Sequence, residues 1–320
     1  MANTSGRITL WNIEVFVATA EERSISIAAK RLQTSAATVS QQLTSLEGAI
    51  GTALLNRSAR PVTMTPAGEM FLGRANAILN EAEQARAELA IADFSRLMRL
   101  RLGMIEDFDA DVTPRLLEEM GSDLQSCQFL LETGASHQLC DFLESRSLDM
   151  IVASEIGAAA DWMEVHPLME EPLVVAVPKG QLKEGDLARQ LRRLPFVQYT
   201  TRHHMGRLIS DHLARQNLTL AGRFELDSYH AIMAMVASGA GWTILTPLGW
   251  RRAHRFREQV DLMPLPFAPL TRRISLTARR GVLGEMPTEV AVKLRSILQD
   301  MIVGPAIAQA PWLEEQMKIF

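Results

Sequence analysis

The chain has few cysteines and no long hydrophobic run. Two of its 320 residues are cysteine, Cys127 and Cys140, so no disulfide framework is available and a reducing cytoplasm is the expected compartment. No stretch reaches the roughly 18 consecutive apolar residues of a transmembrane helix, so we expect no membrane partner. The first residues lack a charged segment followed by an apolar run, so no signal peptide is predicted.

The sequence also lacks the local motifs of common enzymes. It contains no nucleophile elbow, no glycine-rich phosphate loop and no zinc-spaced cluster. The pair His203-His204 has no acidic or cysteine partner at ligand spacing, so neither a metal nor a cofactor is predicted. An enzyme or a solute-binding module is therefore the less favoured class.

What is present is an ordinary globular composition with an uneven distribution of charge. A length of 320 residues indicates two or three domains, and 47% hydrophobic residues can bury their cores. The net charge of −4 does not indicate nucleic acid. Between residues 24 and 60, however, one acidic residue, Glu47, stands against four basic residues: Lys30, Arg31, Arg57 and Arg60. A local basic excess is typical of a DNA-binding face.

The segment 24–46 predicts two short helices joined by a tight turn. Ser24 and Ser35 each suit a helix N-cap, where a hydroxyl accepts a bond from an early backbone N–H. A buried face of the second helix is predicted, at helical spacing, by Val39, Leu43, Leu46 and Ile50. A helix pair with a polar outer face fits a DNA major groove, but such pairs also occur in other small bundles.

Residues 54–65 predict two short strands around a basic tip, which is the pattern of a wing. Arg57 and Arg60 in this tip suit contact with phosphate. A helix then begins at Thr65-Pro66 and runs to about residue 97. Its apolar stripe, for which pairing with a second copy of the chain is expected, comprises Phe71, Ile78, Ala82, Ala85, Leu89 and Ala92.

Beyond residue 98 the predicted strands and helices alternate. Strands near 98–104, 129–131 and 148–153, with helices between them, favour a parallel α/β sheet. A second such unit begins near residue 196, and a late strand at 274–278 precedes a closing helix. Residues 304–320 lie past that helix, and both packing on a neighbour and disorder are open for them.

The order of these parts resembles the LysR-type transcriptional regulators. The similar residues run from Phe16-Val17-Ala18, through the two predicted helices and Leu54-Leu55-Asn56-Arg57, to Thr65-Pro66-Ala67-Gly68. The chain has Ala36-Ala37-Thr38 where the family usually has Gln-Pro-Ala, and Gln41 where it usually has Arg. These are positions of the recognition face, so the resemblance does not supply an operator sequence.

The resemblance implies an α/β multidomain chain. Its parts would be a winged helix-turn-helix DNA-binding domain (1–66), a linker and dimerisation helix (67–97), a two-lobed periplasmic-binding-protein-like effector domain (98–303) and a C-terminal extension (304–320). Lobe I would take residues 98–176 and 265–303, and lobe II residues 177–264, with crossovers near Val177 and Pro264.

The resemblance further implies a sequence-specific regulator of transcription that is modulated by a small molecule bound between the lobes. Its partners would be a double-stranded DNA operator, the effector and further copies in a homodimer or homotetramer, with RNA polymerase as another candidate. The candidate DNA contacts are Ser24, Ser35, Ala36, Thr38, Gln41, Gln42, Arg57 and Arg60.

Effector pockets of the family use loops at strand ends, and these map onto several segments of this chain. The candidates are Ile105, Glu106, Asp107, Thr133, Gly134, Ser136, Thr200, Thr201, Arg202 and Thr246. If the carboxylates of Glu106 and Asp107 face the cleft, a cationic or amino effector is predicted. Alternatively they face solvent or cap the next helix.

A redox-responsive or effector-independent regulator of the same family is the alternative. Cys127 and Cys140 would be the thiols of a redox switch, although peroxide-sensing relatives carry their usual pair in the second lobe. Buried, inert thiols are the other interpretation of these two residues.

Overall fold

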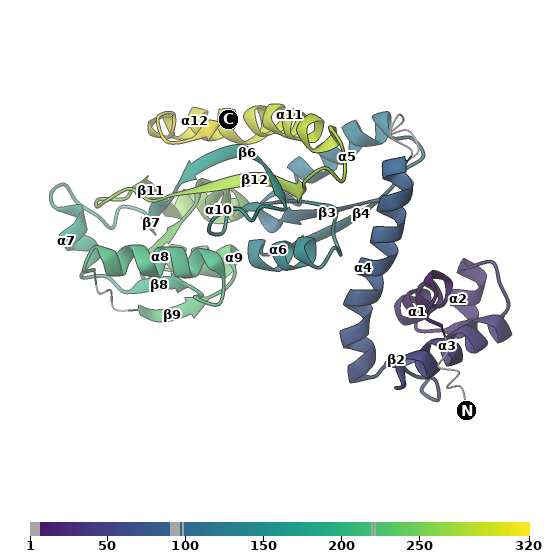
Figure 1. Cartoon of the computed structure of the whole chain (residues 1–320). Helices are drawn as coiled ribbons and strands as arrows, with labels where there is room; N and C mark the ends of the chain where they lie inside the picture. Colours follow the sequence, from purple (N-terminus) through teal and green to yellow (C-terminus); the bar gives the residue numbers. More distant parts are fainter. Residues whose placement is uncertain (1–6, 90–96, 98, 219, 221) are drawn as a thin grey trace. The chain divides into compact units, whose positions relative to one another are not determined.

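The computed structural model describes residues 7–89, 97, 99–218, 220 and 222–320, and these form two compact units (Figure 1). The N-terminal unit consists of a three-helix core, a small wing and the long helix α4. The C-terminal unit contains the remaining sheets and helices except for the segment Phe142–Leu148, which is assigned to the N-terminal unit. None of the described helices is both long enough and apolar enough to cross a membrane.

Side-chain caps begin the three helices of the N-terminal unit. These helices are α1 (Leu10–Glu22), α2 (Ile25–Arg31) and α3 (Ala36–Ile50), and their caps are Thr9, Ser24 and Ser35. Helix α3 ends at Gly51, whose φ of 84° is a left-handed conformation that glycine adopts without strain. Strand β1 (Leu55–Asn56) pairs antiparallel with β2 (Thr63–Met64), which confirms the predicted wing.

Helix α4 (Pro66–Leu89) begins within the core of the same unit. A Cβ atom at Gly68 would collide with the carbonyl oxygen of Leu54, so glycine lets the helix pass close to the wing. The ring of Phe71 lies 5.4 Å from that of Phe16. Phe71 therefore packs against this core and is half-buried, and its part in the pairing stripe stays a prediction. The predicted stripe residues Leu89 and Ala92 lie beyond the side chains that the structure describes.

A mixed six-stranded sheet forms lobe I of the C-terminal unit (Figure 1), in the order β13-β6-β12-β5-β3-β4. Its strands are β3 (Arg99–Ile105), β4 (Gln128–Gly134), β5 (Met150–Ser154), β6 (Met163–Pro172), β12 (Thr271–Arg279) and β13 (Lys318–Ile319). Helices α5 (Val112–Asp123) and α11 (Met286–Leu298) lie on one side of the sheet and α6 (Ser136–Glu144) on the other.

Lobe II is built from two smaller sheets. Strands β7 (Val174–Pro178), β10 (Thr243–Leu245) and β11 (Val260–Pro264) pair antiparallel, whereas β8 (Phe196–Tyr199) and β9 (Gly222–Leu226) pair parallel. The helices of this lobe are α7 (Leu187–Leu191), α8 (His204–Arg215), α9 (Tyr229–Ala237) and α10 (Pro247–Arg252). The indole of Trp242 is fully buried and lies 5.0 Å from the ring of Phe196, in the core of the lobe.

The strand pairing differs from the prediction in two respects. Only β3, β4 and β5 are parallel in lobe I, because β6, a ten-residue strand absent from the prediction, pairs antiparallel with β12. The first crossover lies at Leu173 rather than near Val177, because β7 pairs within lobe II. Strands β6 and β12 thus run side by side to the point where the chain passes between the lobes.

The C-terminal segment folds back onto its own unit. After α11, the chain makes a π turn (Gln299–Val303), α12 (Gly304–Gln309) and a short 3-10 turn (Pro311–Leu313). Strand β13 then pairs with β6 at the edge of the sheet. Leu313 and Met317 are buried. The tail is an integral part of this unit, so neither of the two open readings of residues 304–320 describes it.

Candidate functional site

The candidate DNA-binding face is the outer side of α3. The Oγ of Ser35 accepts a bond from the N–H of Thr38 at 3.0 Å, and this fixes the start of the helix. Val39, Leu43 and Leu46 are buried beneath the helix. The predicted contact residues stay accessible, with Ala36 and Gln41 exposed and Thr38 and Gln42 half-buried. Ser24 caps α2 by accepting from the N–H of Ile27 at 3.4 Å.

The two arginines of the wing have different surroundings. The guanidinium of Arg57 forms an ion pair with Glu47 and donates to the hydroxyl of Thr44 at 3.0 Å. Glu47 in turn accepts from the N–H of Leu54 at 2.8 Å. Arg57 therefore connects the wing to α3, and it is also a candidate phosphate ligand. Arg60 is exposed, and within the described part of the chain it donates to the nearby carbonyls of Arg57 and Ala59.

The candidate effector site is a small cavity, of about 60 Å³, where the two lobes face each other. Its predicted lining residues are Ile105, Glu106, Asp107, Gly134 and Ser136, all from lobe I. Three more lining residues, Ala135, His203 and His204, belong to the loops that were expected to form the pocket. The sequence did not single out the other residues that line the cavity, which are His137, Ser154, Tyr199, Met205, Tyr229 and Arg272.

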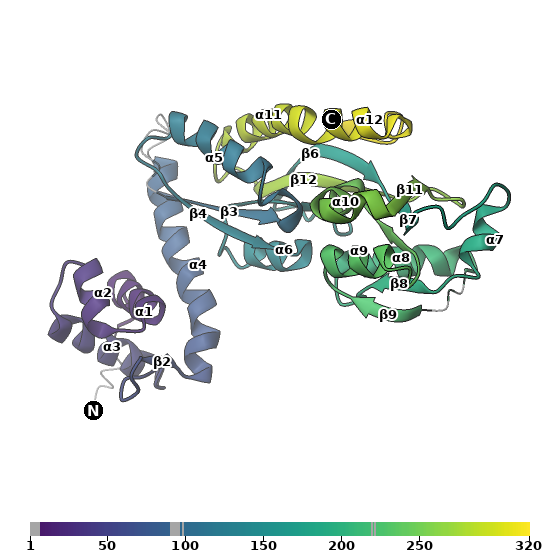
Figure 2. The same cartoon turned by 180° about the vertical axis from the view of Figure 1, so that it is seen from behind.

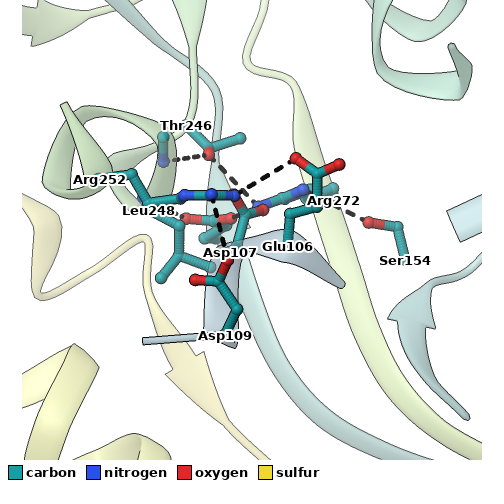
Figure 3. Close-up of polar contacts among 10 residues, drawn as sticks. Glu106, Asp107, Asp109, Ser154, Thr246, Leu248, Arg252 and Arg272 are labelled. Carbon is teal, nitrogen blue, oxygen red and sulfur yellow. Dashed lines mark hydrogen bonds and ion pairs between the residues drawn. The ribbon is translucent and has the colours of Figure 1, made fainter. Parts of the chain in front are cut away.

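At the base of the cavity lies the buried guanidinium of Arg272, on strand β12 (Figure 3). It contacts Asp107 Oδ2 at 2.6 Å and Glu171 Oε1 at 2.6 Å through different nitrogens. Glu171 is completely buried, and this burial raises the pKa of its carboxyl group, while Arg272 beside it favours the charged form. The two carboxylates in turn raise the pKa of Arg272. The arginine is therefore a permanent cation in this network.

Arg272 connects both lobes. Asp107 belongs to the 3-10 turn Glu106–Phe108 at the end of β3 in lobe I. The hydroxyl of Thr246, the N-cap of α10 in lobe II, lies 3.3 Å from Arg272 Nη2. The N–H of Leu248 in the same helix donates to Glu171 at 3.2 Å. A change at the cavity wall can therefore be transmitted to the junction of the lobes.

Helix α10 supplies two further arginines that neutralise the acidic loop of lobe I. Arg251 lies 2.7 Å from Asp111. Arg252 lies 3.4 Å from Asp109 and 3.5 Å from Glu106 (Figure 3). The carboxylates of Glu106 and Asp107 border the cavity, yet each pairs with an arginine of this chain. Both carboxylates therefore border the cleft as expected, with the side chain of Asp107 buried and that of Glu106 largely exposed, and each already has a cationic partner within the chain.

Imidazole and phenol groups form the upper wall of the cavity. The ring of His203 lies 5.6 Å from that of His137 and 5.8 Å from that of Tyr199, and Tyr199 lies 5.1 Å from Tyr229. Burial lowers the pKa values of His203 and His204 and raises that of Tyr199 to about 12. His203, His204 and Tyr199 are consequently mainly neutral at pH 7, and they can accept or donate hydrogen bonds.

The remaining predicted effector residues do not border this cavity. The hydroxyl of Thr200 donates to Glu225 at 2.7 Å, and Thr201 donates its N–H to the same carboxylate. Arg202 is exposed near Asp227, and Thr133 is exposed on β4. Thr246 contributes indirectly, through Arg272. Within the described ranges, no three His, Cys, Asp or Glu side chains are grouped to hold a metal ion.

Both thiols lie in lobe I, outside the cavity lining. Cys127 precedes β4 and Cys140 lies in α6, and both are half-buried. Burial raises the pKa of each thiol. Because the thiolate is the form that reacts with peroxide, this environment disfavours oxidation.

Comparison with known proteins gives two family matches. Residues 10–69 match the bacterial regulatory helix-turn-helix proteins of the lysR family. Residues 96–290, more than half of the chain, match the LysR substrate binding domain.

Individual relatives agree with these matches. A probable hydrogen peroxide-inducible genes activator of Mycobacterium xenopi is 30% identical over 195 residues, which cover 61% of this chain and all of that protein. The DNA-binding transcriptional dual regulator OxyR of Escherichia coli K12 is 25% identical over 277 residues, covering 84% of this chain and 89% of that protein.

Solved structures share the fold. A full-length OxyR variant from Pseudomonas aeruginosa superposes with a TM-score of 0.66 at 21% identity, covering 91% of this chain and 95% of that one. Full-length CbnR complexed with its target DNA gives a TM-score of 0.59 at 19% identity, covering 90% and 100%. The helix-turn-helix, the wing and the two-lobed unit are thus those of one family, and this chain belongs to the LysR family of DNA-binding transcriptional regulators.

Proposed function

We propose that this regulator reads its operator through the outer face of α3. Gln41 and Gln42 offer amide groups that pair with adenine edges, and the methyl group of Thr38 suits contact with thymine. Arg60 is placed to bind phosphate, because its exposed guanidinium bonds to neighbouring carbonyls and to no carboxylate of the residues that the structure describes. The accessible polar face of α3, opposite its buried apolar face, supports this proposal.

Operator binding by two copies of the chain is the second part of the proposal. Among the side chains of α4 that the structure describes, Met70 is 80% exposed and Ile78 is 40% exposed. Such side chains on a long helix are stabilised when a second copy covers them. A homodimer paired through α4, assembling further into a homotetramer, would present two recognition helices to two half-sites.

The cavity between the lobes is the proposed effector site. One observation supports this proposal above all: Arg272 lines the cavity and bonds to residues of both lobes, Asp107 in lobe I and Thr246 in lobe II. The effector is compact, since the cavity measures about 60 Å³. It carries hydrogen-bond acceptors, because the first turns of α6 and α8, at Ser136-His137 and His204-Met205, border the cavity. A cationic effector is disfavoured, because arginines already pair with Glu106 and Asp107.

A thermal-shift screen of small polar metabolites tests the effector site. A true effector should raise the melting temperature of the full chain and change its affinity for operator DNA. His204→Gln should reduce both effects, because His204 lines the cavity. The control is Arg215→Gln at the far end of α8, which should respond as the unaltered chain does. Effector responses that are identical in both variants would exclude this cavity.

Redox control is the second candidate function, because several relatives are named hydrogen peroxide-inducible genes activators. The raised pKa values of Cys127 and Cys140 argue against it. Operator affinity measured with peroxide and with dithiothreitol should therefore be equal, both in the unaltered chain and in the double variant Cys127→Ser, Cys140→Ser. A peroxide response that the double variant loses would establish redox control instead.

A further inference from the structure

A second cavity, of about 260 Å³, lies between helix α10 and the C-terminal segment that follows α11. Figure 2 shows α10 and α12 from the side where both are visible. One wall is formed by Leu248 of α10, and the facing wall by Ile302, Ala306, Leu313 and Met317. This cavity has no lining residue in common with the cavity between the lobes. Its walls are mainly apolar. Residues 304–320 supply much of one side, because this segment folds back onto the unit.

Two arginines border this apolar space, and only one of them has a carboxylate partner. Arg251 pairs with Asp111 at 2.7 Å. Arg257 donates to two neutral oxygens, Gln309 Oε1 and the carbonyl of Arg251, each at 3.2 Å. Among the residues that the structure describes, no Asp or Glu lies within ion-pair distance of Arg257, and its buried Nε has no hydrogen-bond partner.

The surroundings of Arg257 make its charge costly. Its guanidinium lies 4.6 Å from the centre of the Trp250 ring, which offers only a partial counterpart to a full charge. Burial and the neighbouring cation Arg251 both lower the pKa of Arg257. A half-buried cation without an anion, beside an apolar cavity, is complementary to a molecule that has an anionic end and a hydrocarbon body.

We propose that this second cavity is a binding site for a small organic carboxylate. The carboxylate group pairs with Arg257 and displaces the side chain of Gln309, which is exposed and can turn to solvent. The hydrocarbon body fills the space between Leu248 and the wall formed by Ala306 and Leu313.

The location of the site couples it to the cavity between the lobes. Leu248 lines the second cavity with its side chain, while its backbone N–H donates to Glu171, the partner of Arg272. A ligand that fixes α10 against the C-terminal segment therefore acts on the same helix whose N-cap, Thr246, contacts Arg272. Occupancy of the second cavity is expected to alter the affinity of the first.

Isothermal titration of the full chain with hexanoate tests the site, with hexan-1-ol and hexylammonium as neutral and cationic counterparts. We expect saturable binding of hexanoate, and affinities at least about tenfold lower for the alcohol and the amine, because they lack the charge-assisted bond. Arg257→Gln should lower hexanoate affinity by a similar factor. Arg255→Gln is the matched control, because Arg255 is exposed, lies over Phe256 and does not line the cavity.

Filling the cavity provides a second, independent test. Ala306→Phe, and the milder Ala306→Val if the larger residue prevents folding, should weaken hexanoate binding while a melting curve shows that the chain is folded. Absence of saturable hexanoate binding, or equal affinity in Arg257→Gln and Arg255→Gln, would overturn the proposal. So would loss of binding in His204→Gln alone, which would place the ligand between the lobes. No DNA is present, so the result is independent of operator recognition.

Discussion

The guanidinium of Arg272 bridges two carboxylates from different elements, with Asp107 Oδ2 2.6 Å from Nη2 and Glu171 Oε1 2.6 Å from Nε. These three groups are nearly or completely buried. Each charge is stable there only because the others are present, since an isolated buried charge loses hydration free energy that no partner charge offsets. The network therefore makes the junction of the lobes both rigid and sensitive to charge.

Replacing Arg272 by methionine should strongly destabilise the C-terminal unit. The change leaves Asp107 and Glu171 buried without a cation, and we expect a loss of about 3–5 kcal/mol in the free energy of unfolding. Urea denaturation followed by circular dichroism measures it. The neighbouring Arg273→Met is the control, because Arg273 pairs with Glu170 at the surface and should cost less than about 1 kcal/mol. Equal losses in the two variants would mean that the buried network contributes little.

The sequence revealed the local features of this fold but not the long-range ones. Ser24, Ser35 and Gly51 determine helix ends through bonds and conformations within a few residues, so their roles are readable from the chain. Arg272 and Glu171 are brought together by the antiparallel pairing of β6 with β12, which no local pattern reports. The sequence did contain one signal. Side chains alternate between the two faces of a strand, so Arg272 shares its face with the buried residues Ile274, Leu276 and Ala278 and interrupts an otherwise apolar row.

Lowering the pH should destabilise the C-terminal unit through the histidines of the cavity. The folded-state pKa values of His203 and His204 lie below the ordinary value of 6.5, so the unfolded chain binds more protons in the interval between the two. The stabilisation they confer is complete above pH 6.5 and is lost as the pH falls through the lowered values. We expect the melting temperature to fall as the pH is lowered below 6.5.

The double variant His203→Gln, His204→Gln checks this assignment. Its melting temperature should depend less steeply on pH over the same interval, because its side chains do not titrate. The charged groups that face the two histidines, among them Glu106, Asp227 and Arg207, are the same in the variant and in the unaltered chain. An unchanged slope would mean that His203 and His204 do not cause the pH dependence.

Arg57 and Glu47 should act together in holding the wing against α3. Arg57→Ala removes the ion pair and the bond to Thr44, so we expect a loss of about 1.5–3 kcal/mol in the stability of the N-terminal unit. Glu47→Gln should cost a similar amount. In the double variant the losses should be clearly less than additive, as thermal denaturation of the three variants can show. Additive losses would mean that the two side chains act separately.

Arg60 should contribute to DNA affinity without contributing to sequence preference. Arg60→Ala removes the proposed contact with phosphate, so binding to operator and to unrelated DNA should weaken alike. The slope of log affinity against log salt concentration should decrease in magnitude by about 1. Fluorescence anisotropy at several salt concentrations measures both quantities. A loss confined to the operator would instead indicate that Arg60 contacts a base.

Selection of duplex DNA from a random pool, with the full chain as the selecting protein, tests most directly whether α3 reads sequence. We expect enrichment of a motif with two related half-sites, as a paired regulator requires. Gln41→Ala should weaken binding to that motif by about 1–3 kcal/mol and relax the base preference at one position of each half-site. Failure to enrich any motif, or an identical motif and affinity with Gln41→Ala, would contradict the assignment of this face to DNA recognition.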